Sequence, residues 1–155
     1  MKRDNKNFQT PMEIIEYMAL MIGFKPECIL EPTPGAGRMV RYLRSGGYKV
    51  AAPKDIFSLS KGKRFDMVVM NPPFTPMDLG YKILFDCMDR SDNIIALMPW
   101  LTIINSEKRL KKIDDYGIRS ITHLPRRIFS GSRVQTCILE LASWYRGSIE
   151  FKIYE

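Results

Sequence analysis

The chain has 155 residues, of which 24 are lysine or arginine and 17 are aspartate or glutamate, so its formal net charge is +7. This length fits one domain, and we expect residues 1–155 to fold as a single domain. The contents of 45% hydrophobic and 26% charged residues argue against a disordered or fibrous protein. The absence of a long apolar run and the polar start, which is unlike a signal peptide, predict a soluble cytoplasmic protein without a membrane segment.

Cysteine and histidine are sparse. The three cysteines, Cys28, Cys87 and Cys137, lie far apart, and His123 is the single histidine. An odd number of cysteines without a close pair indicates a reducing compartment rather than a disulfide framework or a zinc site. We therefore expect no metal site and no Ser-His-Asp triad.

The first half of the chain alternates helical and strand patterns. Apolar residues at helical spacing predict a helix up to Ile22, with Thr10 able to cap it and Pro11 in its first turn. Further predicted elements are a short strand over 28–30, a helix around 39–45, a second strand over 48–52 and a buried strand over 65–70. Between Ala52 and Asp66 the chain has about 14 residues (66 − 52), too few for a full strand-helix-strand crossover, so we expect a shortened sheet.

The second half continues this alternation and then changes character. The predicted elements are a helix over 78–90, a strand over 94–98, a basic helix over 106–116, a strand over 118–124, and two strands over 134–141 and 149–154. The last two flank Arg146-Gly147 and are predicted to form an antiparallel hairpin. The whole pattern predicts an α/β fold of three layers, with a mostly parallel, Rossmann-like sheet and an antiparallel C-terminal hairpin.

The loop from Glu31 to Gly37 has the sequence E-P-T-P-G-A-G and follows the first predicted strand. Ligands of open parallel sheets bind beyond the carboxyl ends of strands, and Gly35 and Gly37 would let the backbone approach one. The dinucleotide pattern G-x-G-x-x-G fails because Val40 occupies its third glycine position. An acidic strand end beside glycines suits a ligand with an ammonium group and a nucleoside, such as S-adenosylmethionine. An ordinary strand-to-helix turn has the same composition.

A second loop, Asn71-Pro72-Pro73-Phe74, ends the buried strand abruptly. The two prolines restrict the backbone, so that the Asn71 amide oxygen and the Pro72 carbonyl can face one point. Two acceptors there suit a planar amino group, on whose ring Phe74 can stack. Accepting both N–H hydrogens favours the nitrogen as it becomes pyramidal and attacks an electrophilic methyl group. The alternative is a proline-rich turn with a packed phenylalanine.

Basic residues crowd two segments. They are Lys108, Arg109, Lys111 and Lys112 in a predicted helix, and Arg126, Arg127 and Arg133 around a later loop. If these residues converge they can contact the phosphates of a nucleic acid, DNA above all. The alternative is a solvated basic surface.

Together these segments resemble the class I S-adenosylmethionine-dependent amino-methyltransferases, especially the DNA adenine-N6 methyltransferases. Phe8-Gln9-Thr10-Pro11 resembles the family's F-x-T-P element, the loop from Glu31 to Gly37 its D/E-P-x-x-G-x-G cofactor motif, and Asn71-Pro72-Pro73-Phe74 its D/N-P-P-Y/F catalytic motif. The order of these motifs is that of the subgroup whose target-recognition domain comes last. The resemblance spans almost the whole chain.

The resemblance implies methyl transfer from S-adenosylmethionine to the N6 amine of adenine in DNA. The implied catalytic residues are Asn71, Pro72 and Phe74. The implied cofactor residues are Phe8, Thr10, Glu31, Pro32, Gly35, Gly37, Asp55 and Phe57. Two departures stand out: the acid that usually ends the second strand is missing or displaced to Asp55, and no recognition domain follows, so we expect low specificity or a partner chain that supplies it.

Three other functions remain open. The same catalytic loop occurs in enzymes that methylate RNA bases or a glutamine amide in proteins, because these acceptors also present a planar amino group. The displaced acid and the short crossover also fit a non-catalytic methyltransferase-like module that binds nucleic acid or a partner. A nucleotide-dependent oxidoreductase is disfavoured by the glycine spacing.

Overall fold

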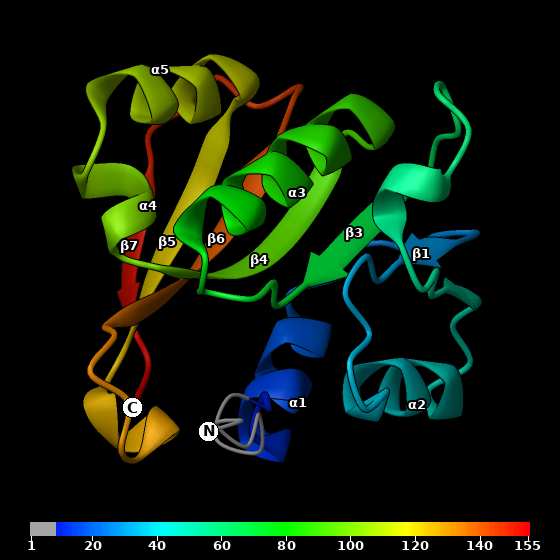
Figure 1. Ribbon diagram of the computed structural model, residues 1–155, viewed down its shortest axis with the longest axis horizontal. Coiled ribbons are helices and arrows are strands. Elements are labelled where there is room, and N and C mark those ends of the chain that lie inside the picture. Colours follow the sequence, from blue (N-terminus) through cyan, green and yellow to red (C-terminus); the bar gives the residue numbers. More distant parts are fainter. Residues whose placement is uncertain (1–8) are drawn as a thin grey trace.

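The computed structural model describes residues 9–155, which form one seven-stranded sheet with helices on both faces (Figure 1). The elements in chain order are α1 (Met12–Leu20), β1 (Ile29–Leu30), α2 (Arg38–Ser45), β2 (Val50–Ala51), the 3₁₀ turn η2 (Ile56–Ser58), β3 (Met67–Met70), α3 (Met77–Arg90), β4 (Asn93–Pro99), α4 (Leu101–Ile104), α5 (Glu107–Tyr116), β5 (Ile118–Leu124), η3 (Arg126–Phe129), β6 (Thr136–Ala142) and β7 (Glu150–Ile153). None of the described helices is long and apolar enough to cross a bilayer.

The strands lie in the order β2-β1-β3-β4-β6-β5-β7. β1 pairs in parallel with β2 and β3, β3 with β4, and β5 with β7. β6 runs antiparallel to both of its neighbours, β4 and β5. The sheet is therefore mostly parallel with an antiparallel hairpin, which confirms the predicted fold class.

The predicted pairing of the last two strands is wrong. β6 and β7 are not neighbours; the hairpin is formed by β5 and β6, and β7 pairs in parallel with β5 at the edge of the sheet. Burial explains the difference. Six of the seven residues of β6 are buried, as expected of a strand between two others, whereas three of the four residues of β7 are exposed.

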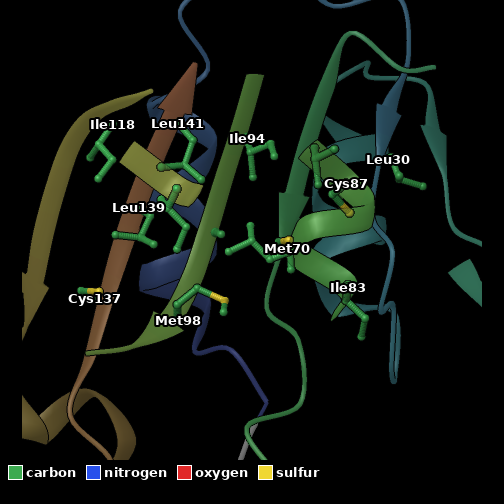
Figure 2. Close-up of a cluster of buried hydrophobic side chains, with 14 of the residues drawn as sticks. Leu30, Met70, Ile83, Cys87, Ile94, Met98, Ile118, Cys137, Leu139 and Leu141 are labelled. Atoms are coloured by element: carbon green, nitrogen blue, oxygen red, sulfur yellow. The ribbon is translucent and has the colours of Figure 1, made fainter. Parts of the chain in front are cut away.

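Side chains alternate between two cores along the central strands. In β3, Met67 and Val69 face α1 and α2, whereas Val68 and Met70 face α3. Figure 2 shows the core on the α3 side, where Ile83 and Cys87 lie close to Met70. These two cores produce the predicted three-layer arrangement and fix the ends of β1 and β3.

The shortened part of the sheet lies where the sequence predicts it. Only η2 connects β2 to β3, and β1 and β2 have two residues each. Among the described residues, no full helix occupies this crossover. The strands β4, β5 and β6 are longer, with seven residues each.

Candidate functional site

The two loops singled out in the sequence lie side by side. β1 and β3 are adjacent parallel strands, so Glu31, directly after β1, and Asn71, directly after β3, emerge at the same carboxyl edge of the sheet. The buried patterns of the two strands hold these positions firmly. Thr10, which precedes α1, completes the group.

Thr10 and Asn71 are joined by a direct hydrogen bond. The Asn71 side-chain Nδ2 donates to Thr10 Oγ1 at 2.7 Å, and Thr10 is only 8% exposed. The predicted capping role of Thr10 is therefore wrong: Pro11 is the N-cap of α1, which has no side-chain cap, and the Thr10 hydroxyl contacts Asn71 instead. Arg38 at the start of α2 donates to the Thr10 carbonyl at 3.3 Å and holds this segment in place.

This hydrogen bond orients the Asn71 amide. Because Nδ2 is directed to Thr10, Oδ1 points the other way, and no donor among the described residues is bonded to it. No backbone hydrogen bond of the described residues uses the Pro72 carbonyl. Both acceptors of the predicted catalytic pair are thus available for a ligand.

Glu31 is a buried carboxyl group with an unusual pKa. It is 2% exposed, and burial raises its pKa from 4.5 to about 7, although hydrogen bonds from Thr33 oppose the rise. Thr33 donates to Oε1 from its backbone N–H at 2.8 Å and from its hydroxyl at 3.3 Å. Among the described residues no cationic side chain pairs with Glu31. A bound cation would therefore find an uncompensated acceptor there.

Thr33 connects the two loops, and sequence reasoning missed it. Besides its bonds to Glu31, its Oγ1 lies 3.3 Å from the Asn71 carbonyl oxygen. The signal that could have found it is its position, since it is a polar residue between two prolines in the first loop. Pro32, beside it, is buried.

The two glycines of the first loop adopt the left-handed conformation. Gly35 has φ +52° and Gly37 has φ +81°, a region that residues with a Cβ rarely adopt. A Cβ at Gly35 would meet no atom within 4 Å, so open space adjoins the loop. At Gly37, the N-cap of α2, a Cβ would come within 3.1 Å of Arg41 Nη1.

We expect Gly37→Ala to destabilise the protein by about 1–2 kcal/mol, because the Cβ of alanine makes a positive φ sterically unfavourable. The control is Gly23→Ala: Gly23 lacks a positive φ, and its added Cβ meets no atom within 4 Å. Urea unfolding measures both. Equal midpoints for the two variants would contradict the strained geometry at Gly37.

Phe74 is half-buried against the core on the α1 side. Together with Pro73 it borders a small hollow whose other walls include Tyr81 and the fully buried Thr102. The Thr102 hydroxyl has no hydrogen-bond partner among the described residues. The hollow is too small for an aromatic base, so a ring that stacks on Phe74 must lie on its open side.

The remaining predicted cofactor residues are not joined to this group. Asp55 Oδ1 accepts from the backbone N–H of Phe57 at 2.9 Å and caps η2, and both side chains are exposed. No hydrogen bond among the described residues links them to Glu31 or Asn71. Phe8 lies outside the described residues.

The predicted basic residues form two separate groups. α5 carries Lys108, Arg109, Lys111 and Lys112. Arg126 and Arg127 lie in η3 and Arg133 follows it; this segment comes after the carboxyl end of β5, at the same edge of the sheet as Asn71. Figure 1 shows α5 at the opposite end of the molecule from η3.

The α5 residues also have local partners. Arg109 contacts Asp78 at 3.5 Å, Lys111 contacts Asp115 at 3.2 Å, and Lys112 lies over the Phe85 ring at 4.1 Å. The structure therefore does not bring the two basic groups to one cleft. Only the η3 group lies on the edge that carries the candidate site.

Several solved structures share this fold. A Listeria monocytogenes protein described as a class I S-adenosylmethionine-dependent methyltransferase superposes with a TM-score of 0.72 at 16% identity, over 98% of this chain and 68% of its own. A type I restriction-modification methyltransferase subunit from Streptococcus thermophilus has a TM-score of 0.72 at 14% identity, over 94% of this chain. The 23S rRNA methyltransferase ErmE has a TM-score of 0.56 at 16% identity, over 88% of this chain and 69% of its own.

No protein-family model and no curated protein matches the sequence. The chain spans less than half, 46%, of the restriction-modification subunit. At these identities the likeness concerns the fold and not the chemistry. The chain has the fold of the class I S-adenosylmethionine-dependent methyltransferases.

Proposed function

We propose that this protein is an S-adenosylmethionine-dependent N-methyltransferase whose acceptor is the N6 amine of adenine in DNA. The observation that carries the proposal is the oriented Asn71 amide. Its Nδ2 is bound to Thr10, and its free Oδ1 lies on the sheet edge that also carries the glycine loop and the buried carboxyl of Glu31.

The residues of the first loop fit this cofactor. Glu31 is a buried carboxyl without a cationic partner among the described residues, and it suits the ammonium group of a methionine moiety. Gly35 leaves space beside the loop for a nucleoside. S-adenosylmethionine, when bound, supplies an electrophilic methyl group on a sulfonium. The chain's own residues then have to hold the acceptor amine in line with it.

Asn71 and Pro72 would hold that amine. An aromatic amine is a weak nucleophile because its lone pair is delocalised into the ring. Hydrogen bonds from its two N–H groups to Asn71 Oδ1 and the Pro72 carbonyl favour the pyramidal nitrogen with its lone pair aimed at the methyl group. Phe74, whose open side faces away from the core, would stack on the base. An asparagine cannot take up the extra proton that the methylated nitrogen would carry, so this proton would pass to water.

DNA is favoured over RNA by the sequence, since Phe8-Gln9-Thr10-Pro11 resembles the F-x-T-P element of DNA methyltransferases. One of the structures that share the fold is the methyltransferase subunit of a type I restriction-modification system. By analogy with that subunit, we propose that a partner chain supplies sequence recognition.

The proposal is tested by incubating the protein with S-adenosylmethionine labelled on the methyl group and with DNA, RNA and protein acceptors in parallel. We expect label in DNA and none in DNA from which adenine is absent. Label in RNA or in protein glutamine would show that the acceptor is not DNA, although the protein would still be an N-methyltransferase. Calorimetric titration without detectable cofactor binding would favour a non-catalytic binding module.

DNA binding is expected to depend on the η3 group of basic residues. Replacing Arg127 and Arg133 by alanine should weaken binding uniformly across sequences and lower the salt slope by about one for each lost phosphate contact. The matched control replaces Lys108 and Lys111 on α5 and should leave the slope unchanged. Fluorescence anisotropy over a series of salt concentrations measures both; a larger effect from the α5 pair would contradict this placement.

A further inference from the structure

The edge strand β7 presents an unpaired row of backbone groups. One side of β7 pairs with β5, and Tyr154 N–H donates to the His123 carbonyl at 3.0 Å. Because backbone groups alternate along a strand, the N–H and C=O of Phe151 and Ile153 point away from the sheet. No strand among the described residues lies beyond β7. Figure 1 shows β7 in red at the end of the sheet opposite β1.

The side chains of β7 differ between its two faces. On one face Phe151 is 60% exposed and Ile153 is 64% exposed, and the centroid of the Trp100 ring lies 6.3 Å from that of Phe151. On the other face Glu150 and Lys152 contact each other at 3.7 Å. An exposed apolar edge strand is a template for pairing with another strand.

We propose that β7 pairs antiparallel with β7 of a second copy of this chain, about a twofold axis at Phe151. This register places Glu150 opposite the partner's Lys152, and Lys152 opposite the partner's Glu150. It also places Phe151 opposite the partner's Phe151, and Ile149 opposite the partner's Ile153. The outward N–H and C=O groups of Phe151 then form a hydrogen-bonded pair across the axis.

Charge selects this register among those that the backbone allows. The outward N–H and C=O groups of one β7 must face those of the other. The twofold axis must therefore pass through a residue of β7, and not midway between two residues. An axis at Lys152 would place Lys152 directly opposite the partner's Lys152. An axis at Glu150 would likewise place two glutamates directly opposite each other. Only the axis at Phe151 pairs opposite charges on both sides of it.

The resulting dimer would be an isologous one with a continuous sheet of two sets of seven strands. The twofold axis directs the carboxyl edges of the two sheets in opposite directions. Each copy therefore keeps its own Glu31 and Asn71 at an open edge. The dimer does not depend on the proposed methyl transfer and can be tested without it.

The test uses the full chain and its oligomeric state in analytical ultracentrifugation. We expect a reversible dimer, weakened at least about tenfold by Glu150→Lys and by Lys152→Glu, since each creates like charges across the axis. The decisive experiment mixes the two variants. In β7 one variant carries two lysines and the other carries two glutamates. The mixture should therefore form a heterodimer as tight as the wild-type dimer.

Restoration by mixing can only be intermolecular, because each variant still carries two like charges within its own β7. Circular dichroism melts confirm that both variants fold. Glu27→Lys, an exposed charge reversal outside β7, is the control and should leave the dimer intact. A wild type that stays monomeric, single variants that dimerise as tightly as the wild type, or a mixture without a heterodimer would each overturn the proposal.

Discussion

Replacing Asn71 by alanine is expected to lower kcat by about 10²- to 10³-fold, while the Kd for S-adenosylmethionine changes by less than about threefold. The Asn71 Oδ1 has no protein donor among the described residues, and its proposed partner is the acceptor amine as it becomes pyramidal. An interaction of this kind strengthens on the way to the transition state and contributes little to cofactor binding. Single-turnover kinetics and calorimetric titration measure the two quantities separately.

Two further variants make this result specific. Asn105→Ala removes an exposed asparagine after α4 and should leave kcat unchanged. Thr10→Val removes the acceptor of the Asn71 Nδ2 bond but keeps Asn71 itself, so we expect a smaller loss of about tenfold from a misoriented amide. Equal losses of kcat and of cofactor affinity in Asn71→Ala would contradict the role assigned to this residue.

The second large effect concerns Glu31 and pH. Burial raises its pKa to about 7, and the ammonium group of the cofactor favours the ionised carboxylate. Cofactor affinity should therefore rise with pH through this range, roughly eightfold between pH 6 and pH 7.5 from the fraction of Glu31 that is ionised. Glu31→Gln cannot ionise, so its affinity should be low and lack this rise.

The ligand's own amino group titrates identically with both proteins, so the difference between their pH profiles reports Glu31 alone. Calorimetric titrations of S-adenosylmethionine at a series of pH values provide the comparison. Parallel profiles for the wild type and Glu31→Gln would show that the carboxylate does not face the cofactor's cation.

The same group affects stability in the opposite sense. The folded protein holds the Glu31 proton more tightly than the unfolded chain, so this contribution is complete below pH 4.5 and is lost as pH rises to about 7 and beyond. It corresponds to about 3 kcal/mol at high pH. Glu31→Gln keeps the acceptor for Thr33 and should be more stable than the wild type at pH 8. In the proposed site, the ionised Glu31 carboxylate that would bind the cofactor's cation therefore lowers the stability of the folded protein.

Much of the sheet could be predicted because local sequence patterns indicate where its strands begin and end. The continuous apolar run before Asn71 gives a strand buried on both faces, and the prolines after it fix where that strand ends. The short stretch between Ala52 and Asp66 likewise predicts the missing crossover helix from chain length alone. These features depend on neighbours in sequence, which a single chain displays directly.

The features that sequence reasoning missed depend on contacts between distant segments. The hydrogen bond from Asn71 to Thr10 spans 61 residues, and no local pattern distinguishes a capping threonine from one that orients an amide. The pairing of β7 with β5 also depends on which strand occupies the interior of the sheet. β6 lies there because it is more completely buried, and β7 lies at the edge. The separation of the basic helix α5 from the η3 arginines likewise could not be predicted without knowing the topology of the sheet.

The most direct test of the proposed site is a crystal structure with S-adenosylhomocysteine and an adenine-containing oligonucleotide. We expect the amino acid part of the cofactor near Glu31, and the adenine N6 within about 2.7–3.2 Å of both Asn71 Oδ1 and the Pro72 carbonyl oxygen. A complex in which the Asn71 oxygen faces away from the acceptor, or in which the cofactor lies away from the loop of Gly35 and Gly37, would contradict it.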